Sequence, residues 1–389
     1  MFSSLKVNWN YPTAMYVGAG RVGEIAAICA AFGIRRPLVV TDEGAAVLPF
    51  TPRIMDLLKE AGLEAALFSQ VPSNPTDACV EAGAGFYREG AHDGVIALGG
   101  GSGLDAGKAI ALLAGQSRPL IDFEDVGDNY ARANSASIAP VIAVPTTAGT
   151  GSEVGRASVI TFSATHEKKI IFHPKMMPVA VISDPELTVG LPAQLTAATG
   201  IDAFTHCFEA FCAPGYHPMA DGIALEGMRL VKEWLPIAYE DGSHIEARTH
   251  MLSAASMGAT AFQKGLGAVH ALSHPVGAVY NAHHGLTNAI FLPYVMVKNG
   301  PVIEEKMVHL GSYLGLGSGG FEAVLDWILA FRRSLGIPAG ASGLGLKREN
   351  IAMLAEAALQ DPSMGGNPQP LSAAELAELY ERSLVADLG

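Results

Sequence analysis

The first half of the chain alternates short apolar runs with stretches of helical periodicity. The clearest apolar runs cover residues 37–41, 94–98 and 140–144, and each ends in polar or glycine-rich residues. Strands that are buried on both faces of a sheet form nearly continuous apolar runs, because neither face is exposed to water. The pattern therefore predicts an α/β domain with a parallel sheet that is covered by helices.

The second half of the chain follows a different pattern. After residue 185 it is rich in Ala, Leu, Met, Glu and His at helical spacing, and strand-like runs are few. A length of 389 residues also favours two domains over one. We expect an α/β domain over residues 1–185 and an all-helical domain over residues 186–389.

Composition and charge narrow the possible partners. Hydrophobic residues make up 49% of the chain, and 38 acidic against 25 basic residues give a net charge of −13. A negative field of this size repels nucleic acid and anionic membranes, so neither is expected as a partner. No apolar run approaches the ~18 residues of a membrane-spanning helix, and the first residues do not resemble a secretory signal.

The four cysteines lack Cys-x-x-Cys spacing. Together with the absence of a secretory pattern, this favours reduced thiols in a cytoplasmic protein. Cys207 and Cys212 flank a candidate metal motif described below. They are expected to be small buried fillers rather than metal ligands.

Two glycine-rich segments compete for the role of a phosphate-binding loop. Residues 18–23 match G-x-G-x-x-G, but the strand expected before them, residues 14–17, is short. Residues 99–103 follow a strongly apolar strand and open a helical stretch, where glycines and a helix N-terminus favour an anion. Residues 145–153, a third polar strand end, would contribute to the same crevice. Ala109 stands where a Walker loop has Ser or Thr, which argues against a kinase or another NTPase.

One carboxylate and five histidines fall in two short segments with helical character. They are Asp202, His206, His270, His274, His283 and His284. Asp202 and His206 are four residues apart, so both side chains project from one face of a helix. Spacing alone would also pair His270 with His274 as chelating ligands. A carboxylate with several imidazoles is a ligand set for divalent iron or zinc.

Taken together, these segments resemble the iron-dependent, group III alcohol dehydrogenases, a family that includes lactaldehyde reductase and the propanediol and butanol dehydrogenases. The resemblance rests on four motifs in the same order and extends over essentially the whole chain. The motifs are Gly99-Gly100-Gly101-Ser102 with Asp105 and Lys108, residues 146–153, Asp184-Pro185 through Asp202-x-x-x-His206, and His270 through His284. The resemblance implies a nucleotide-binding α/β domain followed by an all-α metal-binding domain, the dehydroquinate synthase-like architecture.

The resemblance implies which residues form the metal site. The expected ligands are Asp202, His206, His270 and His284, and the expected metal is Fe²⁺, with Zn²⁺ as the alternative. His274 then becomes a catalytic residue near the metal that relays a proton, in place of the ligand pairing that spacing suggests. The implied reaction moves a hydride between NAD(H) and a small alcohol or aldehyde while the metal polarises the substrate oxygen.

The resemblance also assigns the cofactor to residues 99–102 and makes residues 18–23 a structural turn. Asp42 would face the adenosine ribose, where a carboxylate favours NAD over NADP. The expected cofactor contacts are Asp42, Asn74, Gly99, Gly100, Gly101, Ser102, Asp105, Thr146, Thr147, Thr150 and Lys168. Asp105 is expected to take part in catalysis as well.

Several expectations stay open at the level of sequence. The alternative function is a metal-dependent lyase or cyclase of the dehydroquinate synthase type, which uses NAD only transiently. Many family members have Asn-Pro-Arg in a late loop, whereas Gln369 follows Asn367-Pro368 here. Lys264, six residues before His270, is a candidate to neutralise an anionic substrate, or else a solvated lysine at a helix end. A homo-oligomer, a dimer or larger, is also expected.

Overall fold

The computed structural model describes residues 13–165, 167–317 and 319–388. Within these residues the chain forms two compact units that divide after residue 190. Each unit has its own architecture, and each is described by itself below.

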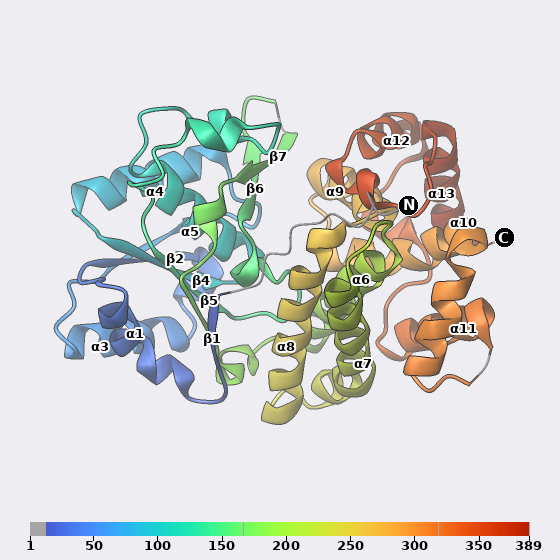
Figure 1. Ribbon diagram of the computed structural model, residues 1–389, viewed down its shortest axis with the longest axis horizontal. Helices are drawn as coiled ribbons and strands as arrows, with labels where there is room; N and C mark the ends of the chain where they lie inside the picture. The colour runs from blue at the N-terminus through green and yellow to red at the C-terminus, as the bar shows by residue number, and fades with distance from the viewer. Residues whose placement is uncertain (1–12, 166, 318, 389) are drawn as a thin grey trace. The chain divides into compact units, whose positions relative to one another are not determined.

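The first unit, residues 13–190, is built on a six-stranded sheet (Figure 1). Its strand order is β1-β8-β5-β4-β2-β3, and all neighbouring strands are parallel. The strands are β1 (Ala14–Val17), β2 (Pro37–Asp42), β3 (Ala66–Val71), β4 (Gly94–Gly99), β5 (Val141–Pro145) and β8 (Ala180–Ser183). The predicted parallel sheet is confirmed, and the three apolar runs coincide with β2, β4 and β5.

Helices cover both faces of this sheet. They are α1 (Ile25–Ala31), α2 (Glu43–Ala46), α3 (Phe50–Glu60), α4 (Asp77–Glu89) and α5 (Gly101–Leu113). On one face, Val39, Ile96 and Ile142 are in register across three strands and join one core with Ile28 of α1 and Ile54 of α3. An antiparallel hairpin of β6 (Ala157–Phe162) and β7 (Glu167–Phe172) completes the unit.

On the other face, α5 packs closely against the sheet because it carries glycines at the contact. A Cβ on Gly107 would lie 2.5 Å from the Cβ of Ala97, and one on Gly103 would lie 2.5 Å from the carbonyl oxygen of Leu98. Any side chain at either position would therefore push the helix away from β4. As a result, α5 begins directly beside the carboxyl end of β4.

The second unit, residues 191–388, is helical, and no strand occurs among its described residues. Its helices are α6 (Ala193–Cys212), α7 (Pro218–Glu240), α8 (Ile245–Ala261), α9 (Ala268–Tyr280), α10 (His284–Tyr313), α11 (Gly320–Ser334), α12 (Ile351–Leu359) and α13 (Ala373–Val385). Helix α6 packs against α7, α8 and α10, and every residue from Thr196 to Cys212 is buried. A helix that is buried all round is expected to be apolar all round, so the polar residues on α6 need a partner.

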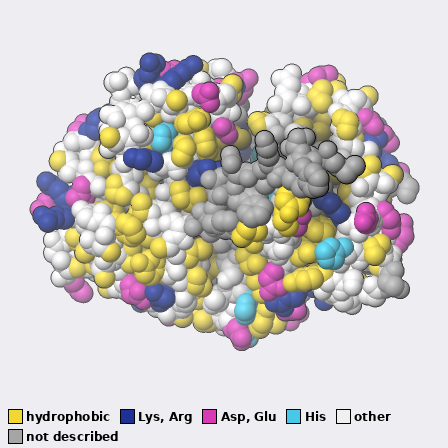
Figure 2. Space-filling model, in the orientation of Figure 1, with side chains coloured by type: hydrophobic (Ala, Val, Ile, Leu, Met, Phe, Trp, Pro, Cys, Tyr) yellow, Lys and Arg dark blue, Asp and Glu magenta, His cyan; other side chains and the backbone are white. Residues whose placement is uncertain are grey.

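None of the described helices is both long and apolar enough to cross a membrane. On the face shown in Figure 2, acidic and basic side chains are interspersed. All four cysteines are free thiols, and Cys29, Cys207 and Cys212 are buried.

Candidate active site

Three ionisable side chains form a stripe along the buried helix α6. Asp202, His206 and Glu209 occupy positions i, i+4 and i+7, which place them on one face of the helix. All three residues are at most 5% exposed. Burial of an unpaired carboxylate is costly, so this stripe requires partners from neighbouring helices.

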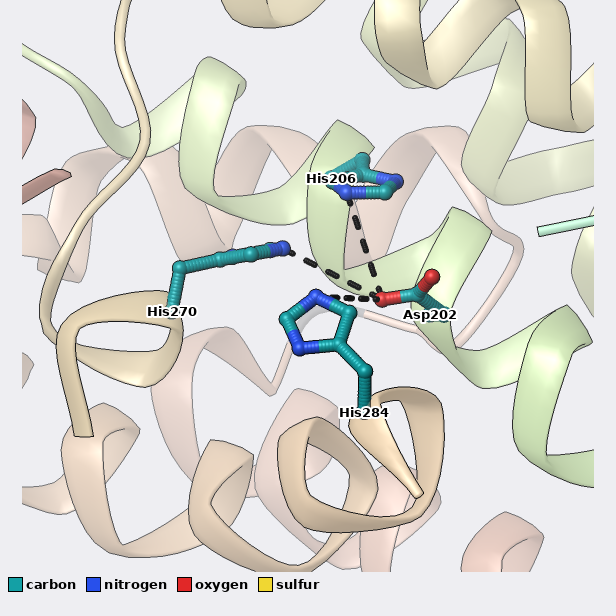
Figure 3. A group of neighbouring side chains, drawn as sticks. All are labelled: Asp202, His206, His270 and His284. Carbon is teal, nitrogen blue, oxygen red and sulfur yellow. Dashed lines mark ion pairs between the residues drawn. The ribbon is translucent and has the colours of Figure 1, made fainter. Parts of the chain in front are cut away.

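The partners come from α9 and α10 (Figure 3). His270 lies in the first turn of α9, and His284 is the first residue of α10. The Oδ1 atom of Asp202 lies 3.9 Å from Nε2 of His206, 3.9 Å from Nε2 of His270 and 3.7 Å from Nε2 of His284. One ligand atom from each of the four residues falls within 4.8 Å of the others. The four residues expected to be ligands are thus brought together.

The donor set and its spacing suit a divalent cation. Four ligands at the usual bond lengths of a tetrahedral zinc site lie about 3.4 Å from one another, slightly closer than the distances observed here. One carboxylate oxygen and three imidazole nitrogens form a mixed N/O set that iron and zinc both accept. A cation at their centre would also compensate the buried charge of Asp202. The residues present therefore fit a metal site.

The electrostatics of the group favour metal binding. Burial lowers the pKa of His270 and His284 well below the usual value, so both rings are neutral and have a free lone pair. Burial alone would raise the pKa of Asp202, but the three imidazoles and a hydrogen bond from Asn288 lower it to about 2. Neutral imidazoles and an ionised carboxylate are the protonation states that a metal requires.

Asn288 was not expected from the sequence and lies at the centre of the group. Its Nδ2 donates to Oδ1 of Asp202 at 2.7 Å and lies 3.1 Å from Nε2 of both His270 and His284. The side chain is fully buried on α10, one turn after His284. Its spacing of four residues from a predicted ligand is the signal that could have identified it.

His274 lies beside the four-residue group and outside it. Its ring stacks on His284 with the centroids 5.3 Å apart, and its Nδ1 lies 2.8 Å from Oδ2 of Asp361. Burial would raise the pKa of Asp361, but the contact with His274 lowers it. The side chain of His274 is 22% exposed, so water can reach it. Asp361 is a second residue that the sequence did not point to.

The expected cofactor residues gather at the carboxyl ends of the parallel strands in the first unit. The chain goes from β2 outward to β3 and then returns to β4 on the other side of β2, so the order of strands reverses between β2 and β4. Such a switch point is where open α/β sheets bind ligands. Asp42 ends β2 and Gly99 ends β4, and a Cβ on Gly99 would lie 3.4 Å from Oδ2 of Asp42.

The two glycine clusters differ in what their backbone amides do. Helix α5 begins at Gly101 without a side-chain cap among the described residues. In contrast, the amides of Gly20 and Val22 donate to the two carboxylate oxygens of Asp184, at 3.2 and 2.9 Å. The amides at the start of α5 are therefore available to an anion, and two of those in residues 18–23 are already used.

The remaining expected cofactor residues surround the start of α5. A Cβ on Gly100 would lie 3.2 Å from the hydroxyl of Thr147, and one on Gly101 would lie 2.8 Å from Cγ2 of Thr150. The amide of Thr146 donates to the carbonyl of Gly99. The hydroxyl of Ser102 donates to the carbonyl of Ser73, next to Asn74. Thr161 lies opposite Lys168 in the hairpin and bridges to Thr76, which brings the segments of Asn74 and Lys168 together.

Three neighbouring groups contact the carboxylate of Asp105. It accepts from the hydroxyl of Ser152 at 2.5 Å and from the amide of Val159 at 2.9 Å, and it lies 3.2 Å from Nζ of Lys108. These contacts tie α5 to the hairpin. They favour a role in positioning the cofactor loop over the direct catalytic role expected from the sequence.

The structure contradicts the expectation that Lys264 is a solvated lysine. The side chain is 3% exposed, its Nζ lies 2.5 Å from Oδ1 of Asp221, and it donates to the carbonyl of Phe211 at 3.4 Å. Phe211 is nine residues beyond Asp202 on α6, which is about 13 Å along the helix axis. Lys264 therefore contacts the end of α6 and does not lie in solvent. In the late loop, Gln369 donates to the carbonyl of Lys298 at 2.8 Å.

Comparison with known proteins yields two family models that together span most of the chain. The model described as "Iron-containing alcohol dehydrogenase" matches residues 12–185. The model described as "Fe-containing alcohol dehydrogenase family, C-terminal" matches residues 196–384.

Individual relatives and solved structures match over almost their full length. The 4-hydroxybutyrate dehydrogenase of Cupriavidus necator is 40% identical over 386 residues, which cover 96% of this chain and 99% of the relative. The NAD-dependent methanol dehydrogenase of Bacillus methanolicus is 35% identical and covers 97% of this chain and 100% of its own. The crystal structure of a 1,3-propanediol oxidoreductase superposes with a TM-score of 0.93 at 32% identity, covering 97% of this chain and 100% of that one.

Proposed function

The chain belongs to the iron-containing alcohol dehydrogenase family, and on this premise we propose that it interconverts a small alcohol and its aldehyde with NAD(H) and a divalent metal, Fe²⁺ foremost. The observation that carries the proposal is the group of Asp202, His206, His270 and His284 in the interior of the helical unit. No relative reported above is named as a lyase, so the alternative of a dehydroquinate synthase-type reaction is not favoured.

The metal would be held by the four side chains of this group. When bound, the metal supplies Lewis acidity and the nicotinamide supplies or accepts the hydride. His274 is the residue that we assign to proton transfer, because it is next to the ligands and accessible to water. Asp361 accepts from its Nδ1, which leaves Nε2 as the nitrogen that exchanges a proton.

The dinucleotide would lie at the strand ends of the first unit. We assign its pyrophosphate to residues 99–102, where α5 begins without a side-chain cap among the described residues, and its adenosine ribose to Asp42. One oxygen of Asp42 caps α2 by accepting from Ala45 at 2.9 Å, which leaves the other oxygen for the ribose hydroxyls. A carboxylate in this position repels a 2′-phosphate and favours NAD. Thr146, Thr147, Thr150, Asn74 and Lys168 would complete the site, with Asp105 holding the loop in place.

The substrate that we propose to test first is 4-hydroxybutyrate with its semialdehyde. The relative with that name is 40% identical over almost the whole chain. The side chain of Lys264 is used elsewhere, so an anionic substrate would have to be recognised by other groups.

The experiment is reconstitution of the metal-free chain with Fe²⁺ or Zn²⁺, followed by a panel of alcohols and aldehydes. The panel contains 4-hydroxybutyrate, 1,3-propanediol, methanol and propanal, and NADH absorbance is the readout. We expect metal-dependent net oxidation or reduction of at least one pair. Turnover of NADH that is equally fast without any metal would contradict the proposal, and so would a reaction without net change in NADH.

We also propose that the chain works in the cytoplasm as a homo-oligomer. Four free thiols in the described residues agree with a reducing compartment. Light scattering of the purified protein measures the oligomeric state directly.

A further inference from the structure

Helix α9 carries two histidines that are each held by a carboxylate. The Nδ1 atom of His270 lies 2.5 Å from Oε2 of Glu209, and that of His274 lies 2.8 Å from Oδ2 of Asp361. The two pairs have the same chemistry and are one helical turn apart. They differ in one respect, because only His270 belongs to the four-residue metal group.

Glu209 is held so that it can serve two donors at once. Its side chain is 4% exposed and lies on α6, on the stripe that begins with Asp202 and His206. Its Oε1 accepts from the amide of Val269 at 2.7 Å, in the first turn of α9, while Oε2 faces the imidazole of His270. A Cβ on Gly267 would lie 3.0 Å from Oε1, so this close approach depends on glycine at the start of α9.

The contact between Glu209 and His270 fixes which ring nitrogen of His270 has the lone pair that a metal needs. A neutral imidazole has one N–H and one lone pair, and the hydrogen bond at Nδ1 decides which nitrogen has which. With its proton on Nδ1 and donated to Glu209, His270 presents the lone pair of Nε2 toward Asp202. Among the described residues, Nδ1 of His206 has no such partner.

We propose that Glu209 is a positioning residue of the metal centre, which orients His270 and fixes its tautomer. This inference rests on the proposed function, because it presumes that the group binds a metal. Carboxylates behind a ligating histidine strengthen metal binding by 10–100-fold in other metalloproteins. A purely structural role, in which Glu209 only caps α9, would leave metal affinity unchanged in a variant that keeps the cap.

Glu209→Gln separates the two roles. The amide oxygen of glutamine can still accept from Val269, but its NH₂ group then faces Nδ1 of His270 and favours the tautomer with the proton on Nε2. Asp361→Asn is the matched control, because it makes the same change in the pair that holds His274. The measurement is the affinity of each variant for Zn²⁺ in competition with a chromogenic chelator, with circular dichroism as a check of the fold.

We expect Glu209→Gln to weaken Zn²⁺ binding tenfold or more, and Asp361→Asn to leave it within twofold of wild type. An affinity of Glu209→Gln within twofold of wild type would overturn the inference, and so would an equal loss in both variants. Failure of the wild-type chain to bind any divalent metal would contradict the proposed function itself. Normal metal binding by both variants would contradict only the role proposed for Glu209.

A measurement on the wild-type chain covers the case in which Glu209→Gln does not fold. In the Zn²⁺-loaded protein labelled with ¹⁵N-histidine, NMR reports which ring nitrogen carries a proton and how fast that proton exchanges. We expect the His270 signal, assigned through a His270→Gln variant, to show a slowly exchanging proton on Nδ1. A proton that exchanges freely with solvent, or none at Nδ1, would overturn the role of Glu209.

Discussion

One added methyl group is expected to have opposite effects in the two glycine clusters, residues 99–103 and 18–23. In Gly103→Ala the new Cβ would lie 2.5 Å from the carbonyl oxygen of Leu98, whereas real Cβ atoms essentially never come within 3.0 Å. Because the obstacle is backbone and cannot rotate away, the start of α5 must move by about 0.5 Å or more. In Gly23→Ala the new Cβ would meet nothing within 4 Å, and the backbone there is not left-handed.

These contacts determine the expected changes in the free energy of unfolding and in the Kd for NADH. Overpacking of this kind costs about 1–3 kcal/mol of the free energy of unfolding. Displacement of the first amides of α5 from the pyrophosphate should raise the Kd for NADH tenfold or more, which corresponds to about 1.4 kcal/mol. Gly23→Ala should leave both quantities close to wild type.

The assay is a fluorescence titration with NADH together with urea unfolding of each variant. Gly101→Ala is a useful third variant, because its Cβ would lie 2.8 Å from Cγ2 of Thr150, a side chain that can rotate. We expect it to weaken NADH binding with little loss of stability. If Gly23→Ala weakened NADH binding tenfold while Gly101→Ala and Gly103→Ala did not, the pyrophosphate would belong to residues 18–23 and the reasoning would be refuted.

Four other predictions concern single side chains. His284→Ala should lose metal and turnover while the Kd for NADH stays within twofold of wild type, measured by metal analysis and fluorescence. Asp42→Gly should raise kcat/KM with NADPH relative to NADH, because it removes the charge that repels a 2′-phosphate, and a glycine N-cap costs only a few tenths of a kcal/mol. Lys264→Ala should lower the free energy of unfolding by about 1–3 kcal/mol, because the half-buried Asp221 loses its cation, and should change KM for 4-hydroxybutyrate and 1,3-propanediol by the same factor. Burial raises the thiol pKa of Cys207 and Cys212 to about 12, so at pH 8 both should react with a disulfide reagent only after unfolding.

Each of these predictions has an outcome that contradicts it. Full metal content in His284→Ala would remove that residue from the ligand set. If Asp42→Gly left the ratio of kcat/KM with NADPH to kcat/KM with NADH unchanged, the ribose would not lie at Asp42. A larger KM effect of Lys264→Ala on the anionic substrate would return the lysine to the substrate site, and rapid reaction of Cys207 or Cys212 in the folded chain at pH 8 would mean that their thiols are accessible.

The sequence predicted those features that depend on local periodicity. The continuous apolar runs of β4 and β5 follow from burial on both faces, which is a property of a single strand. The i, i+4 spacing of Asp202 and His206 needs only that their segment be helical. The family resemblance added the order of the motifs, and it identified the family correctly.

The same periodicity contained a signal that was not used. Glu209 lies seven residues after Asp202 and continues its stripe, and Asn288 lies four residues after His284. A search for every polar residue on the buried face of these helices would have found both. The rule that a buried polar group needs a partner applies to the whole face and not only to the usual ligand types.

Other features depend on contacts between distant segments, and local patterns do not contain them. Asp361 reaches His274 across 87 positions of the chain, through a loop whose course is set by packing. Lys264 is close to His270 in sequence, but the chain turns at Gly265, which has a φ of +139°, and the lysine joins the end of α6 instead. Proximity in sequence was therefore a poor guide to proximity in space.

The turn at residues 18–23 shows that a glycine-rich, anion-binding pattern can find an acceptor within its own chain. Its glycines present backbone amides to an anion, as in a dinucleotide-binding loop. Here the anion is Asp184 of the same chain, whose carboxylate accepts from Gly20 and Val22 just after β8. The pattern thus predicts an anion-binding turn but not the source of the anion. A carboxylate at the end of a neighbouring strand is the feature that would distinguish the two cases in other sequences.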